Sequence, residues 1–143
     1  MKNNIKSFNI RVYALIIEGD KILISKELIK NEILLKFPGG GLEFGEGLIE
    51  GLQREANEEL NQSFEEIKHF YTTDFFQRST FDNEDQLISI YYTAKLSSEL
   101  VNKVKEPIKD QPLFIWMKIK DINVYNLGFS IDKRVLNMVK DLN

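Results

Sequence analysis

The stretch that decides the fold runs from residue 37 to residue 62 and reads FPGGGLEFGEGLIEGLQREANEELNQ. Its first five residues predict a loop, because three successive glycines disfavour any regular element. From residue 47 to residue 60 the pattern is helical. On a helical wheel the apolar residues of this segment share one arc about 120° wide: Leu48, Ile49, Leu52, Ala56 and Leu60. We therefore expect an amphipathic helix over residues 47–60.

The same stretch is strongly acidic. Residues 37–67 contain eight glutamates and a single base, Arg54. Glu55, Glu58 and Glu59 span about 100° beside the apolar arc, so we expect them where the helix meets the rest of the protein. Their spacing places Glu55 within reach of both other carboxylates, with Cβ atoms roughly 5–6 Å apart. Two interpretations follow: a solvated acidic face, or a site where the carboxylates bind a hard cation such as Mg²⁺ or Mn²⁺.

A glycine inside this helix favours the second interpretation. Gly51 lies mid-helix on the same side as the acids, where it costs about 1 kcal/mol relative to alanine. Its lack of a side chain leaves room for something to approach the helix. The glycine loop just upstream also offers backbone carbonyls near the carboxylates.

Outside this stretch the chain alternates between strands and a second helix. Residues 12–17 and 21–25 read as strands joined by a tight turn at Gly19-Asp20. A longer hairpin is expected from residues 64–78 and 87–96, with a polar loop at 79–86 between them.

The C-terminal third contains a polar loop, a strand and a helix. Residues 100–111 read as the loop and 114–119 as the strand. Ser130 is the expected N-cap of the last helix, whose apolar positions are Ile131, Val135, Val139 and Leu142. This order of elements predicts a mixed sheet with helices packed on it.

Length and composition restrict the classes of function. The chain has 143 residues, of which 43% are hydrophobic and 29% charged, so we expect one domain over residues 1–143. The absence of cysteine excludes a disulfide framework and a thiol nucleophile, and the only histidine, His69, is expected to be a strand residue without a catalytic role. A net charge of −3 argues against a nucleic-acid partner. No signal peptide or membrane-spanning stretch is evident, which predicts a cytoplasmic protein.

Six of the residues quoted above have the spacing G-x5-E-x7-R-E-x-x-E-E, namely Gly40, Glu46, Arg54, Glu55, Glu58 and Glu59. This spacing resembles the Nudix box of the Nudix hydrolase family. The resemblance covers residues 40–62 and departs from the family where Asn61 replaces a glycine and Gln62 an aliphatic residue. Asn61 is a mild change, because asparagine also tolerates the left-handed conformation of a helix C-cap. Gln62 brings the packing just after the helix into question.

The resemblance implies an α+β fold in which a mixed sheet lies between helices, a Nudix-type α/β/α sandwich. It further implies an Mg²⁺-dependent hydrolase of acid anhydrides that cleaves the pyrophosphate bond of a nucleoside diphosphate derivative, ADP-ribose-like or a sugar nucleotide. By the same resemblance the metal ligands would be Glu55, Glu58, Glu59 and the carbonyl of Gly40, with Mn²⁺ as a second option. Arg54 would orient the glutamates by ion pairing, and Glu46 would support it. A simpler role for Arg54 is an exposed ion pair with Glu50.

The reaction also needs a base and contacts to the substrate. Glu58 is one candidate base. Asp110, six residues before Trp116 in the polar loop, is another because it resembles the loop acid of some family members, and Glu106 is a weaker third. Arg78 could pair with a phosphate and Phe44 could stack on a base, although a solvated surface and a core position are the simpler interpretations of these two residue types.

Three other functions stay open at this point. The chain could instead sanitise oxidised nucleoside triphosphates, sense a nucleotide without hydrolysing it, or use its acidic helix only to bind a protein. The partner is expected to be a small nucleotide, and a homodimer is an open option.

Overall fold

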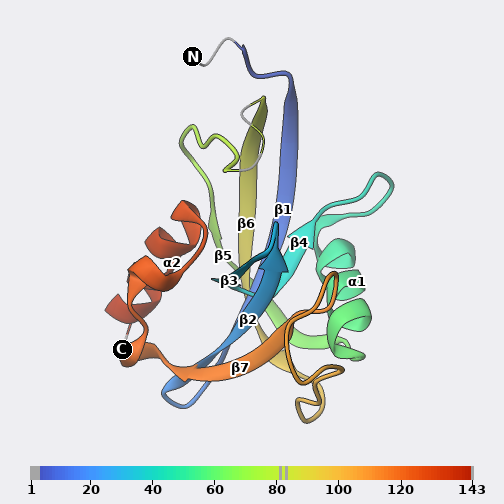
Figure 1. The fold of residues 1–143 in the computed structure, drawn as a ribbon, viewed down its shortest axis with the longest axis vertical. Coiled ribbons are helices and arrows are strands. Elements are labelled where there is room, and N and C mark those ends of the chain that lie inside the picture. Colours follow the sequence, from blue (N-terminus) through green and yellow to red (C-terminus); the bar gives the residue numbers. More distant parts are fainter. Residues whose placement is uncertain (1–3, 81, 83, 143) are drawn as a thin grey trace.

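The computed structural model describes residues 4–80, 82 and 84–142, in which a sheet separates two α-helices (Figure 1). The helices are α1 (Leu48–Leu60) and α2 (Ser130–Asp141). Two short 3₁₀ helices lie between β7 and α2: η2 (Ile119–Asp121) and η3 (Val124–Asn126). The strands are β1 (Ser7–Glu18), β2 (Lys21–Ile29), β3 (Glu32–Lys36), β4 (Gly39–Gly41), β5 (Phe64–Thr72), β6 (Asp85–Leu96) and β7 (Leu113–Lys118).

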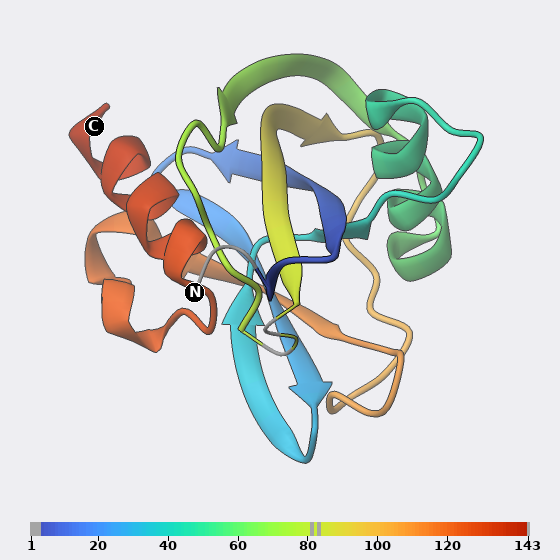
Figure 2. The same ribbon diagram turned by 90° about the horizontal axis from the view of Figure 1, so that it is seen from above.

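Strand β1 is the centre of the sheet. It runs parallel to β6 over ten residue pairs, and antiparallel to β4 on its other edge. Its last residues pair with the start of β2, where Glu18 faces Lys21 across the predicted turn. β5 extends the sheet beyond β6, and β2 pairs with both β3 and β7. The sheet is therefore mixed and lies between α1 and α2 (Figure 2), which confirms the predicted fold class.

Two cores follow from the alternation of side chains along β1. Tyr13 and Leu15 belong to the core that also contains the buried face of α2. Val12, Ala14 and Ile16 belong to the core beneath α1. A central strand covered on both faces needs an unbroken apolar run, which explains why residues 12–16 are all buried.

The predicted helix is confirmed as α1, and both of its ends are fixed locally. At its start, the backbone N–H of Gly47 donates to Glu50 Oε1 at 2.7 Å. At its end, Asn61 takes the left-handed conformation with φ of 55°, as expected of a C-cap. Leu52, Ala56 and Leu60 are buried on the face toward the sheet, whereas Ile49, predicted on the same apolar face, is exposed.

The prediction of a loop over residues 37–41 is wrong for its glycines, which form β4. Gly39, Gly40 and Gly41 pair with Tyr13, Val12 and Arg11. The reason is a close approach of the two backbones: a Cβ on Gly39 would lie 2.1 Å from the carbonyl oxygen of Val12. Because glycine has no side chain, these residues can pair with β1 at this short distance. Their backbone flexibility alone had predicted a loop.

Other boundaries also differ from expectation. β5 ends at Thr72 where a strand to residue 78 was predicted, and β3 was not predicted. Ser130 is the first residue of α2, and the N-cap is Phe129 without a side-chain hydrogen bond. Leu142 lies just past the helix and is 69% exposed, so it is not a core position. The strand predicted at 114–119 is confirmed within one residue as β7.

Candidate functional site

Arg54 joins the acidic helix to the segment that precedes it. Its guanidinium donates to Glu46 through Nη2 at 2.8 Å and Nε at 3.0 Å, and to the carbonyl oxygen of Gly41 at 2.9 Å. Its Nη1 donates to Glu55 Oε1 at 3.1 Å. These hydrogen bonds lower the pKa of Glu46 and raise that of Arg54. Since Glu50 caps Gly47 instead, the structure does not show the simpler role of an Arg54–Glu50 pair.

Glu55 and Glu59, one helical turn apart, form a close pair of carboxylates. The Glu55 carboxylate lies directly on Gly40, because a Cβ built there would be 2.6 Å from Glu55 Oε1. Burial raises the pKa of Glu59 to about 8; Lys36 opposes the rise, and a hydrogen bond with Glu55 adds to it. Two half-buried carboxylates this close repel each other, and a hard divalent cation bound between them would relieve that repulsion. Gly40, Glu55 and Glu59 thus provide a donor set that suits Mg²⁺ or Mn²⁺.

Glu58 has a different orientation. Its side chain is 58% exposed, and its Oε2 lies 3.4 Å from Arg54 Nη1. Within the part of the chain that the structure describes, no three acidic or histidine side chains converge as a ready metal site. Glu58 would join Glu55 and Glu59 only after rotation of its exposed side chain, which its i,i+4 pair with Arg54 opposes weakly.

The structure places Asp110 near these glutamates. A cavity of about 240 Å³ is lined by Glu58, Glu59, Lys103, Asp110, Gln111 and Pro112. Asp110 sits in a tight turn with φ of +62°, and its turn is closed by hydrogen bonds between the backbones of Ile108 and Gln111. The two leading candidates for the base, Glu58 and Asp110, therefore face one cavity. Glu106 does not line it.

A second cavity, of about 280 Å³, lies on the other side of β4. Its polar lining residues are Asn9, Arg11, Tyr13, Glu27, Ser79 and Thr80. Arg11 lies against β4, because its Nη1 would be 3.6 Å from a Cβ built on Gly41. The carbonyl oxygen of the same Gly41 accepts a hydrogen bond from Arg54, which also contacts the glutamates. Arg11 is held in place by donating through Nε to the Tyr13 hydroxyl at 2.6 Å. Phe129 and Ile131 add an apolar wall.

Lys36, which had no predicted role, lines neither cavity but interacts with a lining residue of each, Glu27 by an ion pair and Glu59 through its charge. It is 1% exposed, and its Nζ lies 3.1 Å from Glu27 Oε2. It also donates to the carbonyl oxygen of Gly39 at 2.8 Å. Burial acts to lower the pKa of Lys36, but the Glu27 charge leads the groups that raise it overall. The one sequence signal is a charged residue inside the apolar run ILLKF at residues 33–37.

Asp132, which also had no predicted role, is a buried acid next to Ile131 of the second cavity. It is fully buried at the start of α2 and accepts a hydrogen bond from the Tyr91 hydroxyl at 2.5 Å. Burial raises the pKa of Asp132 to about 6, although that hydrogen bond works against the rise. Tyr91 also stacks on Tyr13, with 5.1 Å between ring centroids, so the second cavity is supported by a hydrogen-bonded and stacked interior.

The predicted substrate contacts are less well placed. Phe44 is fully exposed in the loop between β4 and α1, and lines neither cavity. Arg78 donates to Asn4 Oδ1 at 3.0 Å and lies over the ring of Phe76, beside Ser79 of the second cavity. His69 lies in β5, as predicted, and its ring nitrogen Nε2 forms a hydrogen bond with the Thr72 hydroxyl.

Gly51 serves the chain's own packing. A Cβ at this position would lie 2.7 Å from Leu42 Cδ1 and 2.9 Å from Glu46 Oε1. The expectation that Gly51 leaves room for a ligand is therefore wrong. The space is filled by the loop that brings Glu46 to Arg54.

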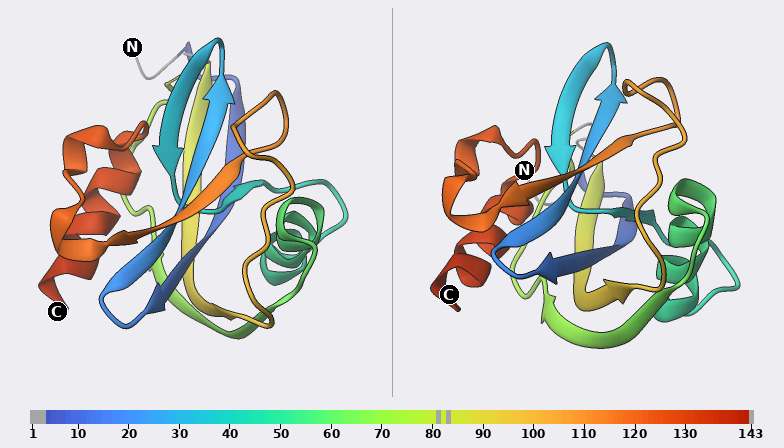
Figure 3. Two further views of the ribbon diagram at one scale, coloured as in Figure 1. Left: turned by 60° about the horizontal axis from the view of Figure 1, so that its bottom comes forward. Right: turned by 90° about the horizontal axis from the view of Figure 1, so that it is seen from below.

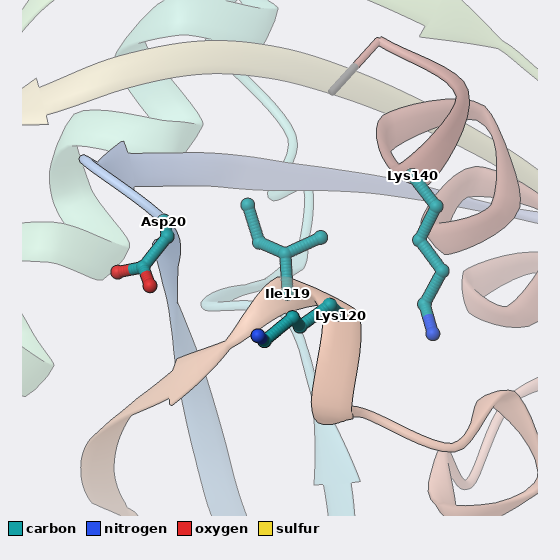
Figure 4. Close-up of a pocket in the computed structure, with 4 residues that line it drawn as sticks. All are labelled: Asp20, Ile119, Lys120 and Lys140. Atoms are coloured by element: carbon teal, nitrogen blue, oxygen red, sulfur yellow. The ribbon is translucent and has the colours of Figure 1, made fainter.

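A further cavity, of about 460 Å³, is lined by Asp20, Ile119, Lys120 and Lys140 (Figure 4). Lys140 donates to the carbonyl oxygen of Ile122 at 2.5 Å. None of the predicted site residues lines this cavity.

Among the described residues, neither α1 nor α2 has the length and hydropathy of a membrane-spanning helix.

Comparison with known proteins agrees with this fold. A family model described as NUDIX domain matches residues 7–138. A NUDIX hydrolase from Nitrosomonas europaea superposes with a TM-score of 0.75 at 20% identity, covering 93% of this chain and 88% of that one. The MutT NUDIX hydrolase from Burkholderia pseudomallei superposes with a TM-score of 0.75 at 21% identity, covering 94% of this chain and 99% of that one. An ADP compounds hydrolase superposes with a TM-score of 0.66 at 15% identity, covering 94% of this chain and 72% of that one. A search of curated proteins found no match.

Proposed function

The chain belongs to the NUDIX family of pyrophosphohydrolases, and from this premise we propose that it hydrolyses the pyrophosphate bond of a nucleoside diphosphate derivative with Mg²⁺. The observation that carries the proposal is the contact between Gly40 and the Glu55–Glu59 pair, held by Arg54. A diphosphate would be repelled by these acids unless a cation lay between them. Bound there, a divalent ion would neutralise phosphate charge and lower the pKa of an attacking water molecule.

The protein's own groups supply the remaining steps. Glu58 or Asp110 would accept the proton of the attacking water, because both face the 240 Å³ cavity beside Glu59. Water would form a bond to one phosphorus atom, and the bridging P–O bond would break. Two phosphate-bearing products would leave.

The second cavity is the natural place for the part of the substrate beyond the phosphates. Arg11 lies between that cavity and Gly41, so its guanidinium could pair with a phosphate or a ribose hydroxyl. Asn9, Ser79 and Thr80 offer polar contacts and Phe129 a ring. Such a mixture suits a sugar or base, and we favour ADP-ribose-like compounds or sugar nucleotides.

A substrate panel tests the proposal. Purified protein is assayed with Mg²⁺ or Mn²⁺ against ADP-ribose, sugar nucleotides and oxidised and normal nucleoside triphosphates, and the products are identified. Two organic phosphates from a diphosphate derivative would support the proposal. A nucleoside monophosphate and pyrophosphate, released faster from an oxidised triphosphate than from the normal one, would instead establish the sanitising activity.

Two other outcomes would reject hydrolysis. Tight binding of one nucleotide without turnover would identify a nucleotide sensor. No binding of Mg²⁺ or Mn²⁺ at millimolar concentration would leave α1 as an acidic interaction helix. A cytoplasmic location and a homodimer stay predictions.

A further inference from the structure

Gln62, at the position where the motif departs from its family pattern, binds the start of the loop that joins β6 to β7. It is 7% exposed and directly follows the C-cap of α1. Its Oε1 accepts from the backbone N–H groups of Ser97 at 2.8 Å and Ser98 at 3.1 Å, and from the Ser97 hydroxyl at 3.2 Å. A buried amide with three donors on one oxygen is a specific attachment, since an aliphatic side chain would leave both N–H groups without this partner.

The same loop, residues 97–112, returns to α1 at a second point. Lys103 Nζ donates to the backbone carbonyl of Glu58, in the last turn of the helix. Carbonyls at a helix C-terminus lack intrahelical partners and carry partial negative charge, so an ammonium group is favoured there. Figure 3 shows this loop running alongside α1.

A third attachment fixes the loop on its other side. The Asn102 side chain accepts from the Phe114 N–H at 2.8 Å and donates to the Phe114 carbonyl at 2.9 Å. Phe114 belongs to β7 and is buried in the core beneath α1. The loop is therefore attached to both α1 and β7 before it reaches the turn that holds Asp110.

These attachments have a consequence at the 240 Å³ cavity, where Asp110 faces Glu58 and Glu59. We propose that Gln62 and Lys103 are positioning residues that dock the loop of residues 97–112 on the C-terminal end of α1, and so place Asp110 beside Glu58 and Glu59. This inference rests on the proposed function, in which Asp110 acts on the attacking water. Gln62 does not line this cavity, whereas Lys103 does, so hydrogen exchange at the Asp110 turn is the readout that separates docking of the loop from contact with the substrate.

The experiment compares matched variants. Gln62→Met and Lys103→Met remove the attachments with little change in volume. Gln53→Met is the control for Gln62, because Gln53 lies on α1 and its side-chain amide likewise makes hydrogen bonds to backbone groups, in this case the two of Phe64 in β5. Lys105→Met is the control for Lys103, since Lys105 is exposed on the same loop and does not line the cavity.

Three quantities are measured for each variant: the melting temperature, the steady-state constants with their Mg²⁺ dependence, and amide hydrogen exchange over residues 108–111. Gln62→Met and Lys103→Met should speed exchange at 108–111 and lower kcat about ten- to a hundredfold, because small misplacements of a catalytic group are that costly. Half-saturating Mg²⁺ should stay within about twofold of the wild type, since Glu55 and Glu59 are not displaced. Lys105→Met should change neither exchange nor kcat.

The outcomes separate the inference from the function beneath it. Unchanged exchange, or faster exchange with an unchanged kcat, overturns the positioning role while hydrolysis stands. An equal loss of kcat in Gln53→Met at an equal melting temperature reduces the effect to general destabilisation and overturns it too. If the wild-type protein hydrolyses no member of the panel, the proposed function fails first and the inference fails with it.

Discussion

A single methyl group at Gly40 should weaken metal binding without unfolding the protein. In Gly40→Ala the new Cβ would lie 2.6 Å from Glu55 Oε1 and 2.8 Å from Glu55 Cδ. Gly40 is outside the left-handed region, so alanine adds no backbone strain there. The whole effect falls on the Glu55 carboxylate, which is the end of a flexible side chain.

The size of the effect follows from the displacement. To restore ordinary contact, the carboxylate oxygen must withdraw by roughly 0.8 Å, from 2.6 Å to 3.4 Å. It would then leave both the glycine and its 3.1 Å hydrogen bond with Arg54. Disturbing the partners that orient a metal ligand typically costs about ten- to a hundredfold in affinity. We expect half-saturating Mg²⁺ to rise at least about tenfold, with a loss of stability of about 1 kcal/mol, the low end for an added methyl group because the contact is with the end of a flexible side chain.

The assay is titration of Mg²⁺ by activity and by calorimetry, with thermal melts of both proteins. Gly19→Ala is the control, because Gly19 has φ of +62° and open space around its Cβ position. That variant should lose about 1 kcal/mol of stability through left-handed strain and keep the wild-type metal dependence. A folded Gly40→Ala protein with unaltered half-saturating Mg²⁺ would show that Glu55 does not bind the ion.

Other predictions concern the glutamates, a buried acid and the helix cap. Glu58→Gln or Glu59→Gln should abolish Mg²⁺-dependent turnover and leave the circular dichroism unchanged; full activity in either would reject its assignment. Asp132 has a folded pKa of about 6 against an ordinary 3.8. Its contribution to the free energy of unfolding is therefore complete below about pH 4 and falls by roughly 3 kcal/mol as the pH rises through about 6. Chemical denaturation of Asp132→Asn should lack that slope, and a parallel slope in both proteins would contradict the burial argument. Asn61→Val should cost about 1–2 kcal/mol because φ there is 55°, and unchanged melting would contradict the role of the cap.

The part of the site on α1 could be predicted because it depends on local geometry. The helix period fixes which of Glu55, Glu58 and Glu59 share a side, and the ends at Gly47 and Asn61 follow from residue type. The pairing of Arg54 with the glutamates and with Glu46 was implied by the resemblance to the Nudix box, and the structure has both contacts. The mixed sheet between two helices likewise follows from the order of the elements.

The remainder depends on segments that are distant in sequence. Gly39–Gly41 form a strand only because β1 supplies a partner, and Gly51 is small because Leu42 and Glu46 fill the space beside it. The burial of Lys36 against Glu27, and the position of Asp110 beside Glu59, are likewise set by packing between elements. A sequence specifies local periodicity directly, whereas burial, desolvation and long-range pairing arise only when the whole chain has closed around a core. The acids of α1 could therefore be identified from the sequence, but their burial and their neighbours were decided by the tertiary structure.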